Sequence, residues 1–162
     1  MKKILVLFAL LLTGLIGKSQ DYDLGIGLRG GVMASGLSAK YFFQPEKAIE
    51  GVLTSKIGDT RYDGFMLTGL LEIQKPFHAR TLSLTSLSWY YGVGAHAGSF
   101  STVGVNHSFV TAGVNALFGL EYLFIDLPIS ISADLMPIWS FNSDFYLDNK
   151  LDLSLSIRYV IK

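Results

Sequence analysis

Apolar and polar residues alternate one by one along most of the chain after residue 22. A period of two predicts a β-strand whose two faces meet different surroundings. Beyond the first twenty residues, no stretch sustains the spacing of an amphipathic helix. The alternation predicts strands at residues 23–32, 36–43, 47–55, 64–75, 87–98, 109–124, 127–137 and 151–161.

Turn-forming residues separate these runs. Gln44-Pro45-Glu46 lies between the second and third runs, where proline presets the backbone for a tight turn. Longer loops are predicted at 56–63, 99–108 and 140–150, and they are the exposed candidates for surface contact. Between the fourth and fifth runs, Leu82 and Leu84 have the opposite parity to Leu87 and Trp89. The change of parity predicts a β-bulge in residues 76–86.

The polar face distinguishes a soluble barrel from a membrane barrel. Leu, Ile and Val dominate one face, whereas the other carries mainly Gly, Ser, Thr and Asn, with few of the Lys and Glu residues that bulk water favours. Small residues fit the interior of an eight-stranded barrel, and a belt of large apolar residues fits lipid. A sheet in a bilayer must close on itself, because every backbone polar group has to be paired. The fold class is therefore all-β: an eight-stranded antiparallel up-and-down transmembrane β-barrel.

Aromatic residues gather near both predicted ends of the strands, as expected for girdles at the two membrane interfaces. One group comprises Tyr41, Phe43, Phe77, Trp89, Tyr122, Phe124 and Tyr159, and the other comprises Tyr62, Phe65, Phe100, Phe109, Trp139 and Phe141.

The N-terminus has the pattern of a secretory signal peptide. Lys2 and Lys3 precede an apolar stretch at 4–16, which is shorter than the roughly 20 residues of a membrane-spanning helix. Small residues at Gly17 and Ser19 predict cleavage after Ser19, giving a signal peptide at 1–19 and a barrel domain at 20–162. The alternative is a retained N-terminal anchor helix.

Composition excludes several classes of function. Only 16% of the 162 residues are charged, and Lys plus Arg equals Asp plus Glu at 13 each. Soluble domains carry about 25% charged residues, and nucleic-acid binding requires a basic excess. We therefore expect no nucleic-acid partner. The absence of Cys excludes disulfides and thiolate sites.

Charged residues on the predicted inward face form the candidate site. Buried charges must pair, so we expect a luminal polar network with a structural role. Its members are Arg29, Lys40, Glu50, Glu72, His96, Glu121, Asp134, Asp152 and Arg158. The short turn at 44–46 predicts Lys40 opposite Glu50, and closure between the first and last strands predicts Asp152 near Arg29. The alternative role is a polar path or ligand site.

Segments such as GLSAKYFFQPEKAIEGVL, GFMLTGLLEIQKPF, LSWYYGVGAHAGSF and LDLSLSIRYVIK resemble the small eight-stranded outer-membrane barrels of Gram-negative bacteria, the OmpA transmembrane-domain, OmpX and OmpW kind. The resemblance covers residues 23–162. It implies a location in the cell outer membrane, with outer-membrane lipid and the barrel assembly machinery as partners. Many such barrels end in an aromatic residue, whereas this chain ends Tyr159-Val160-Ile161-Lys162.

The predicted function is a non-catalytic integral outer-membrane barrel with a structural, surface-interaction or small-solute passage role. We predict no catalytic residue, no cofactor and no metal site. Two alternatives stay open. One is an outer-membrane lipid-modifying enzyme centred on His96, which shares its face with Ser88 and Tyr90. The other is a soluble periplasmic barrel that binds lipid in an apolar interior.

Overall fold

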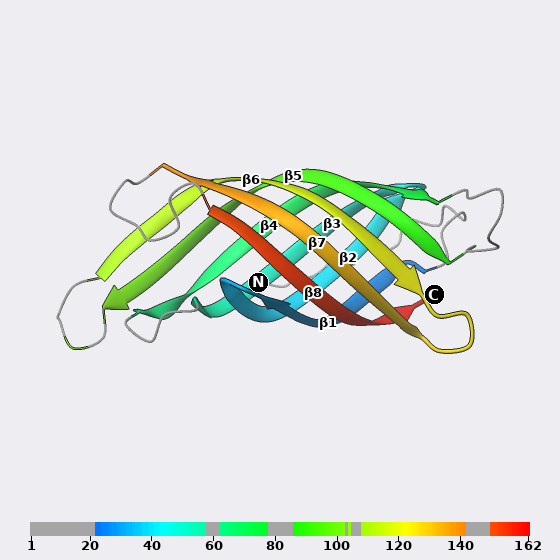
Figure 1. The fold of residues 1–162 in the computed structure, drawn as a ribbon, viewed down its shortest axis with the longest axis horizontal. Helices are drawn as coiled ribbons and strands as arrows, with labels where there is room; N and C mark the ends of the chain where they lie inside the picture. The colour runs from blue at the N-terminus through cyan, green and yellow to red at the C-terminus, as the bar shows by residue number, and fades with distance from the viewer. Residues whose placement is uncertain (1–21, 58–61, 78–85, 103, 105–107, 142–149) are drawn as a thin grey trace, which may run out of the picture.

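A computed structural model describes residues 22–57, 62–77, 86–102, 104, 108–141 and 150–162. Within these residues the chain forms eight strands that close into one barrel (Figure 1). The strands are β1 (Leu24–Gly31), β2 (Ala34–Gln44), β3 (Lys47–Ile57), β4 (Tyr62–Pro76), β5 (Leu87–Thr102), β6 (Ser108–Leu123), β7 (Ile129–Ser140) and β8 (Lys150–Ile161).

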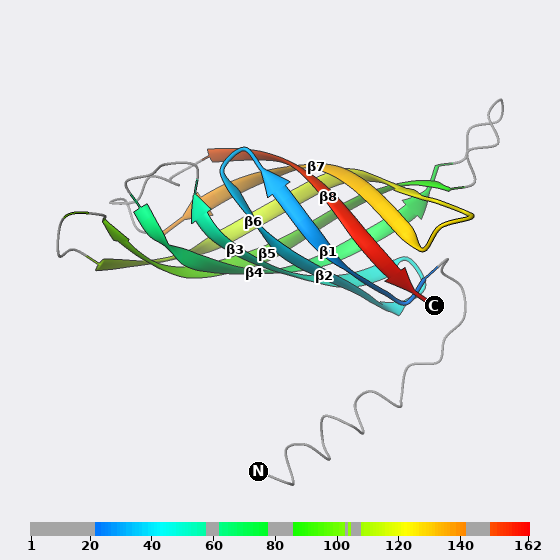
Figure 2. The same ribbon diagram turned by 90° about the horizontal axis from the view of Figure 1, so that it is seen from below.

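Each strand pairs antiparallel with its neighbour in the chain, and β1 also pairs with β8 to close the barrel. The closing register sets Leu28 opposite Leu37 on one side and Ile157 on the other. Figure 2 shows β1 and β8 side by side, with all strands tilted to the long axis. The predicted antiparallel up-and-down barrel is therefore confirmed.

The two ends of the barrel differ in the segments of the chain that lie there. We call the end that holds Tyr22, Lys162 and the β2–β3 turn the terminal end, and the opposite end the far end. At the far end β5 and β7 extend beyond their predicted limits, to Thr102 and Ser140. The backbone ladder continues there, with Ser101 opposite Asp63 and Ser108, although alternation of apolar and polar side chains has ceased. Alternation therefore underestimates strand length at this end.

The burial of apolar and charged side chains is the reverse of that in a soluble protein. Large apolar side chains lie on the outside, where Leu28, Val93 and Leu155 are 61%, 64% and 63% exposed. Inside, the side chains of Lys40 and Arg158 are fully buried. This distribution matches the predicted faces and contradicts a soluble barrel with an apolar interior. Among the described residues there is no helix long and apolar enough to span a membrane.

Apolar clusters fill the lumen between the polar groups. The terminal-end cluster contains Tyr22, Phe42, Ala48 and Val160, the middle cluster contains Val52, Leu70, Tyr90, Leu117, Met136 and Ile138, and the far-end cluster contains Met33, Met66 and Phe100. Phe100 lies at its predicted end but points inward, with 2% exposure and Phe109 packed against it. It therefore belongs to the luminal cluster rather than to a girdle on the outer wall.

The seam between β1 and β8 requires a close backbone approach. A Cβ added at Gly27 would lie 1.9 Å from the carbonyl oxygen of Ile157, well inside van der Waals contact. Gly51 differs, because a Cβ there would meet nothing within 4 Å. Glycine is thus required sterically at the seam. The predicted signal peptide and the predicted β-bulge lie outside the described residues and stay predictions.

Candidate functional site

All nine residues of the predicted polar network lie buried in the lumen. Their exposed fractions are 3% or less, and they come from β1 to β8: Arg29, Lys40, Glu50, Glu72, His96, Glu121, Asp134, Asp152 and Arg158. Alternation along each strand turns these side chains inward, and closure of the sheet brings them together across the lumen.

The ion pair nearest the far end joins β1 to β7. The two terminal guanidinium nitrogens of Arg29 donate to Asp134, Nη1 to Oδ2 at 3.1 Å and Nη2 to Oδ1. Tyr90 Oη donates to the same Oδ2 at 3.0 Å, and Ser154 Oγ donates to Oδ1 at 2.7 Å. Asp134 is therefore held by three side chains from three strands.

The sequence predicted Asp152 near Arg29, but the ion pair of Arg29 is formed with Asp134. Asp152 instead accepts a hydrogen bond from the backbone N–H of Met33 at 3.0 Å. The long guanidinium of Arg29 reaches past the adjacent strand β8 to Asp134 on β7. The backbone register places Arg29 opposite Ser156, two residues beyond Ser154, whose hydroxyl also binds Asp134.

Arg158 forms the middle of the network. Its Nε donates to Ser38 Oγ and its Nη1 to Ser132 Oγ, each at 2.8 Å, while Nη2 binds Glu50. Ser38 Oγ in turn donates to Glu50 Oε1 at 2.6 Å. The guanidinium thus ties β8 to β2, β3 and β7 at one level of the barrel.

Lys40 forms the level nearest the terminal end. Its Nζ lies 2.9 Å from Glu72 Oε2 and 3.0 Å from Glu121 Oε2, and it donates to Gln74 Oε1 at 2.7 Å. The ammonium also lies 4.1 Å from the ring centroid of Tyr90, within the range of a cation–π contact. The Lys40 ammonium therefore contacts two carboxylates, one side-chain amide and one aromatic ring.

The backbone register places Lys40 opposite Glu50, as predicted, although the two side chains have different partners. Glu50 binds Arg158, and Lys40 turns toward Glu72 and Glu121. Register alone does not fix ion pairing inside a small barrel, because long side chains reach strands on the other side of the lumen.

Tyr22 closes the terminal end and was absent from the sequence-based site. It precedes β1, is 3% exposed and donates its phenol O–H to Glu121 Oε1. Burial, reinforced by the charge of Glu121, raises the pKa of Tyr22 well above its usual value of 10.0, so the phenol stays protonated. Tyr22 has the opposite parity to Arg29, so alternation along the first strand gave no signal for its inward position.

His96 lies apart from the ion pairs, toward the far end. Its Nδ1 is 2.7 Å from Asn115 Oδ1, and its Nε2 is 3.3 Å from the hydroxyl oxygen of Ser140. The order of serine, imidazole and amide is that of a nucleophile, a general base and an orienting group. In the part of the chain described, no cluster of three or more His, Asp or Glu side chains is placed to hold a metal ion.

The charged side chains of the polar network lie buried inside the barrel. Its charged side chains cross the interior at three levels, and Arg29, Lys40 and Arg158 face Glu50, Glu72, Glu121, Asp134 and Asp152. Apolar clusters occupy the space between these levels. Such an interior can hold the strands in register, which is the structural role that the sequence predicts.

Comparison with solved structures identifies the class of fold. The N-terminal β-barrel domain of OprF from Pseudomonas aeruginosa matches with a TM-score of 0.63 at 13% identity, covering 84% of this chain and 93% of that domain. Neisserial surface protein A matches with a TM-score of 0.51 at 12% identity, covering 85% of this chain and 94% of that protein. No family model and no curated protein matches the sequence. The chain therefore has the fold of small eight-stranded outer-membrane barrels, as its sequence suggested.

Proposed function

We propose that this protein is an integral outer-membrane barrel with a non-catalytic role in envelope structure or surface interaction. The observation that supports it is the inverted burial pattern, with apolar side chains outside and paired ions inside. Only a bilayer makes that arrangement favourable, because water would leave the belt exposed. The fold shared with OprF and Neisserial surface protein A supports the same location.

The buried ion pairs inside the barrel favour a structural role over free passage of solutes. A permeating ion would have to displace the partners of Arg158, Lys40 and Arg29 in turn. Removing one partner of a buried ion pair costs about 3–5 kcal/mol. Solute passage would therefore require concerted rearrangement of the network, and we propose that the resting barrel is closed.

Three measurements test this proposal. Protein left unboiled should migrate differently from boiled protein in gel electrophoresis, because a closed barrel resists detergent, and sodium carbonate should fail to release it from membranes. Identical mobility together with release by carbonate would contradict the proposal. Refolded protein in planar bilayers should give no steady conductance, and a steady open current would contradict the closed state.

A second candidate function rests on His96, Asn115 and Ser140. In an ester hydrolase, Ser140 Oγ would attack the acyl carbonyl as His96 Nε2 takes its proton, while Asn115 Oδ1 accepts the Nδ1–H. His96 would then give the proton to the leaving alcohol as the ester C–O bond breaks, and water would hydrolyse the acyl-serine to release the fatty acid. The test is release of fatty acid from phospholipid vesicles. Activity lost in both Ser140→Ala and His96→Ala would favour this candidate, and unchanged lipid in the presence of the unaltered protein would exclude it.

A further inference from the structure

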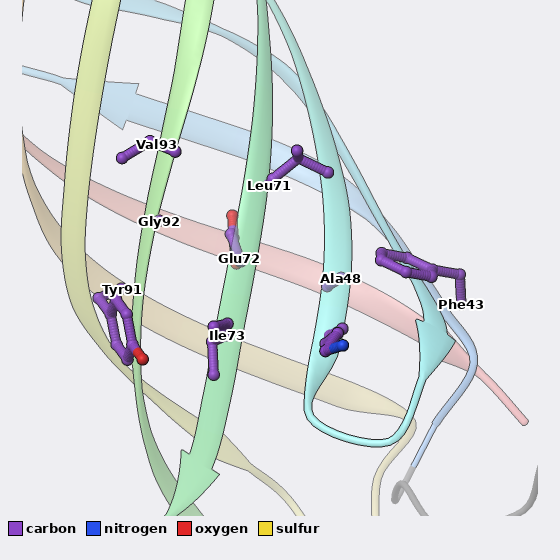
Figure 3. A pocket seen from close by; sticks show the side chains of 9 residues that line it. Phe43, Ala48, Leu71, Glu72, Ile73, Tyr91, Gly92 and Val93 are labelled. Atoms are coloured by element: carbon purple, nitrogen blue, oxygen red, sulfur yellow. The ribbon is translucent and has the colours of Figure 1, made fainter.

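The outer wall of the barrel carries an apolar groove near the terminal end, with a volume of about 290 Å³ (Figure 3). Its floor follows one cross-strand row, in which Ala48, Glu72 and Gly92 lie opposite one another on β3, β4 and β5. Ala48 and Glu72 are buried, with side chains on the luminal side. The strand backbones therefore form the floor of a valley that opens outward.

Two further rows form the walls. Leu71 and Val93 are register partners on one side of the floor, and Ile73 and Tyr91 are register partners on the other. Figure 3 shows Glu72 and Gly92 between these two pairs. Leu71, Val93 and Tyr91 belong to the exposed belt, at 57%, 64% and 40% exposure, so the groove lies on the lipid-facing surface. Three neighbouring strands span about 10 Å, so the groove is long enough to hold part of an acyl chain.

The groove ends at a positive charge. Phe43 from the end of β2 and Lys47 from the start of β3 complete the lining, and both flank the β2–β3 turn at the terminal end. Lys47 is exposed and is the register partner of Ile73 in the wall. An apolar valley that leads to the exposed Lys47 ammonium at the terminal end matches a lipid with an acyl chain and an anionic head.

We propose that this groove binds one glycerophospholipid, with an acyl chain in the valley and its phosphate against the Lys47 ammonium. This inference rests on the proposed function, since the ligand comes from the surrounding bilayer. Charge complementarity favours the phospholipid over a second copy of the barrel, because two copies meeting at this face would bring two Lys47 ammonium groups together.

Native mass spectrometry tests the proposal. The protein is refolded into vesicles of phosphatidylethanolamine with a minor share of phosphatidylglycerol, and the barrels are then released in mild detergent. We expect a population that retains one phospholipid. Lys47→Gln should reduce that population about fivefold, which corresponds to about 1 kcal/mol for one lysine at a membrane surface. Val93→Phe, which places a ring over the valley, should reduce it as well.

Lys162→Gln is the matched control. Lys162 is an exposed lysine at the same end of the barrel but follows β8, away from the groove, and its loss should leave lipid retention unchanged. Equal loss in the Lys47 and Lys162 variants, retention unchanged in Lys47→Gln, or a mass of two barrels in place of one barrel with lipid would overturn the proposal. Gel mobility of the same samples separates the proposed function from the proposed lipid site. A barrel that fails to insert into vesicles contradicts the proposed function. A folded barrel whose lipid retention does not depend on Lys47 contradicts only the lipid site.

Discussion

Replacing Arg158 should destabilise the barrel more than the loss of any exposed charge. Arg158→Met keeps much of the side-chain volume but removes three charged hydrogen bonds, to Ser38, Ser132 and Glu50. Glu50 is then left as a buried carboxylate, whose Oε1 keeps the Ser38 hydroxyl and whose Oε2 has no hydrogen-bond donor. Breaking one side of a buried ion pair costs about 3–5 kcal/mol, and we expect a loss in that range.

Adding a second substitution separates the ion pair from simple packing. In Arg158→Met combined with Glu50→Gln, no unpaired carboxylate remains at this level of the lumen. Removing both partners of a buried pair is often close to neutral, so the double variant should recover at least about half of the loss. The coupling energy between the two sites should therefore be at least about 2 kcal/mol, because Glu50→Gln alone also leaves Arg158 without its carboxylate.

Urea unfolding in phospholipid vesicles measures both effects. Trp139 is 45% exposed on the outer wall and Trp89 lies next to the belt, so tryptophan emission shifts to longer wavelength as the strands leave the lipid. A loss below about 1 kcal/mol for Arg158→Met would refute the argument, because it is the value expected for a solvated surface pair. Additive effects of the two substitutions would refute it equally.

Three further outcomes are expected. Gly27→Ala should reduce the fraction of heat-modifiable barrel on gels several-fold, because its Cβ meets the Ile157 carbonyl at 1.9 Å, whereas Gly51→Ala should behave as the unaltered protein. Leu28→Arg places a charge on the 61% exposed outer face and should lower stability in vesicles by about 2–4 kcal/mol; no loss would argue against a lipid-facing belt. Tyr22→Phe should lower the free energy of unfolding by about 1.5–3 kcal/mol near neutral pH, because it removes the hydrogen bond to Glu121. The pKa of Tyr22 is raised in the folded state, so the stability difference between the two proteins should shrink above pH 10.0, where the phenol ionises in the unfolded chain. Urea titrations at several pH values measure both effects.

Alternation was sufficient to predict the barrel and the orientation of its faces. In β8 apolar and polar residues alternate from Leu151 to Tyr159, and every second residue from Asp152 to Val160 is buried. The period of two decides which side chains share a face, and the prevalence of Gly, Ser, Thr and Asn on the polar face decides which side meets lipid. Both the shared faces and their orientation depend on residues close together in the chain, so they can be predicted from a single sequence.

Contacts across the lumen were not predictable in the same way. Arg29 binds Asp134 at a sequence separation of 105, and Tyr22 binds Glu121 at a separation of 99. Such pairs depend on how far each strand is staggered around the closed sheet, which alternation does not specify. Phe100 was assigned to a girdle because its parity was not weighed against its neighbours, although Gly98 and His96 already marked that face as luminal.

Ion pairs that cross the lumen have a consequence for how the barrel assembles. The Arg29–Asp134, Lys40–Glu121 and Arg158–Glu50 pairs each join segments at least 81 residues apart. A sheet that lacks its last two strands would hold Glu50 without Arg158 and Arg29 without Asp134, and such charges are costly in hydrocarbon. Partly inserted intermediates are thereby penalised, and the strands should enter the bilayer in one concerted step.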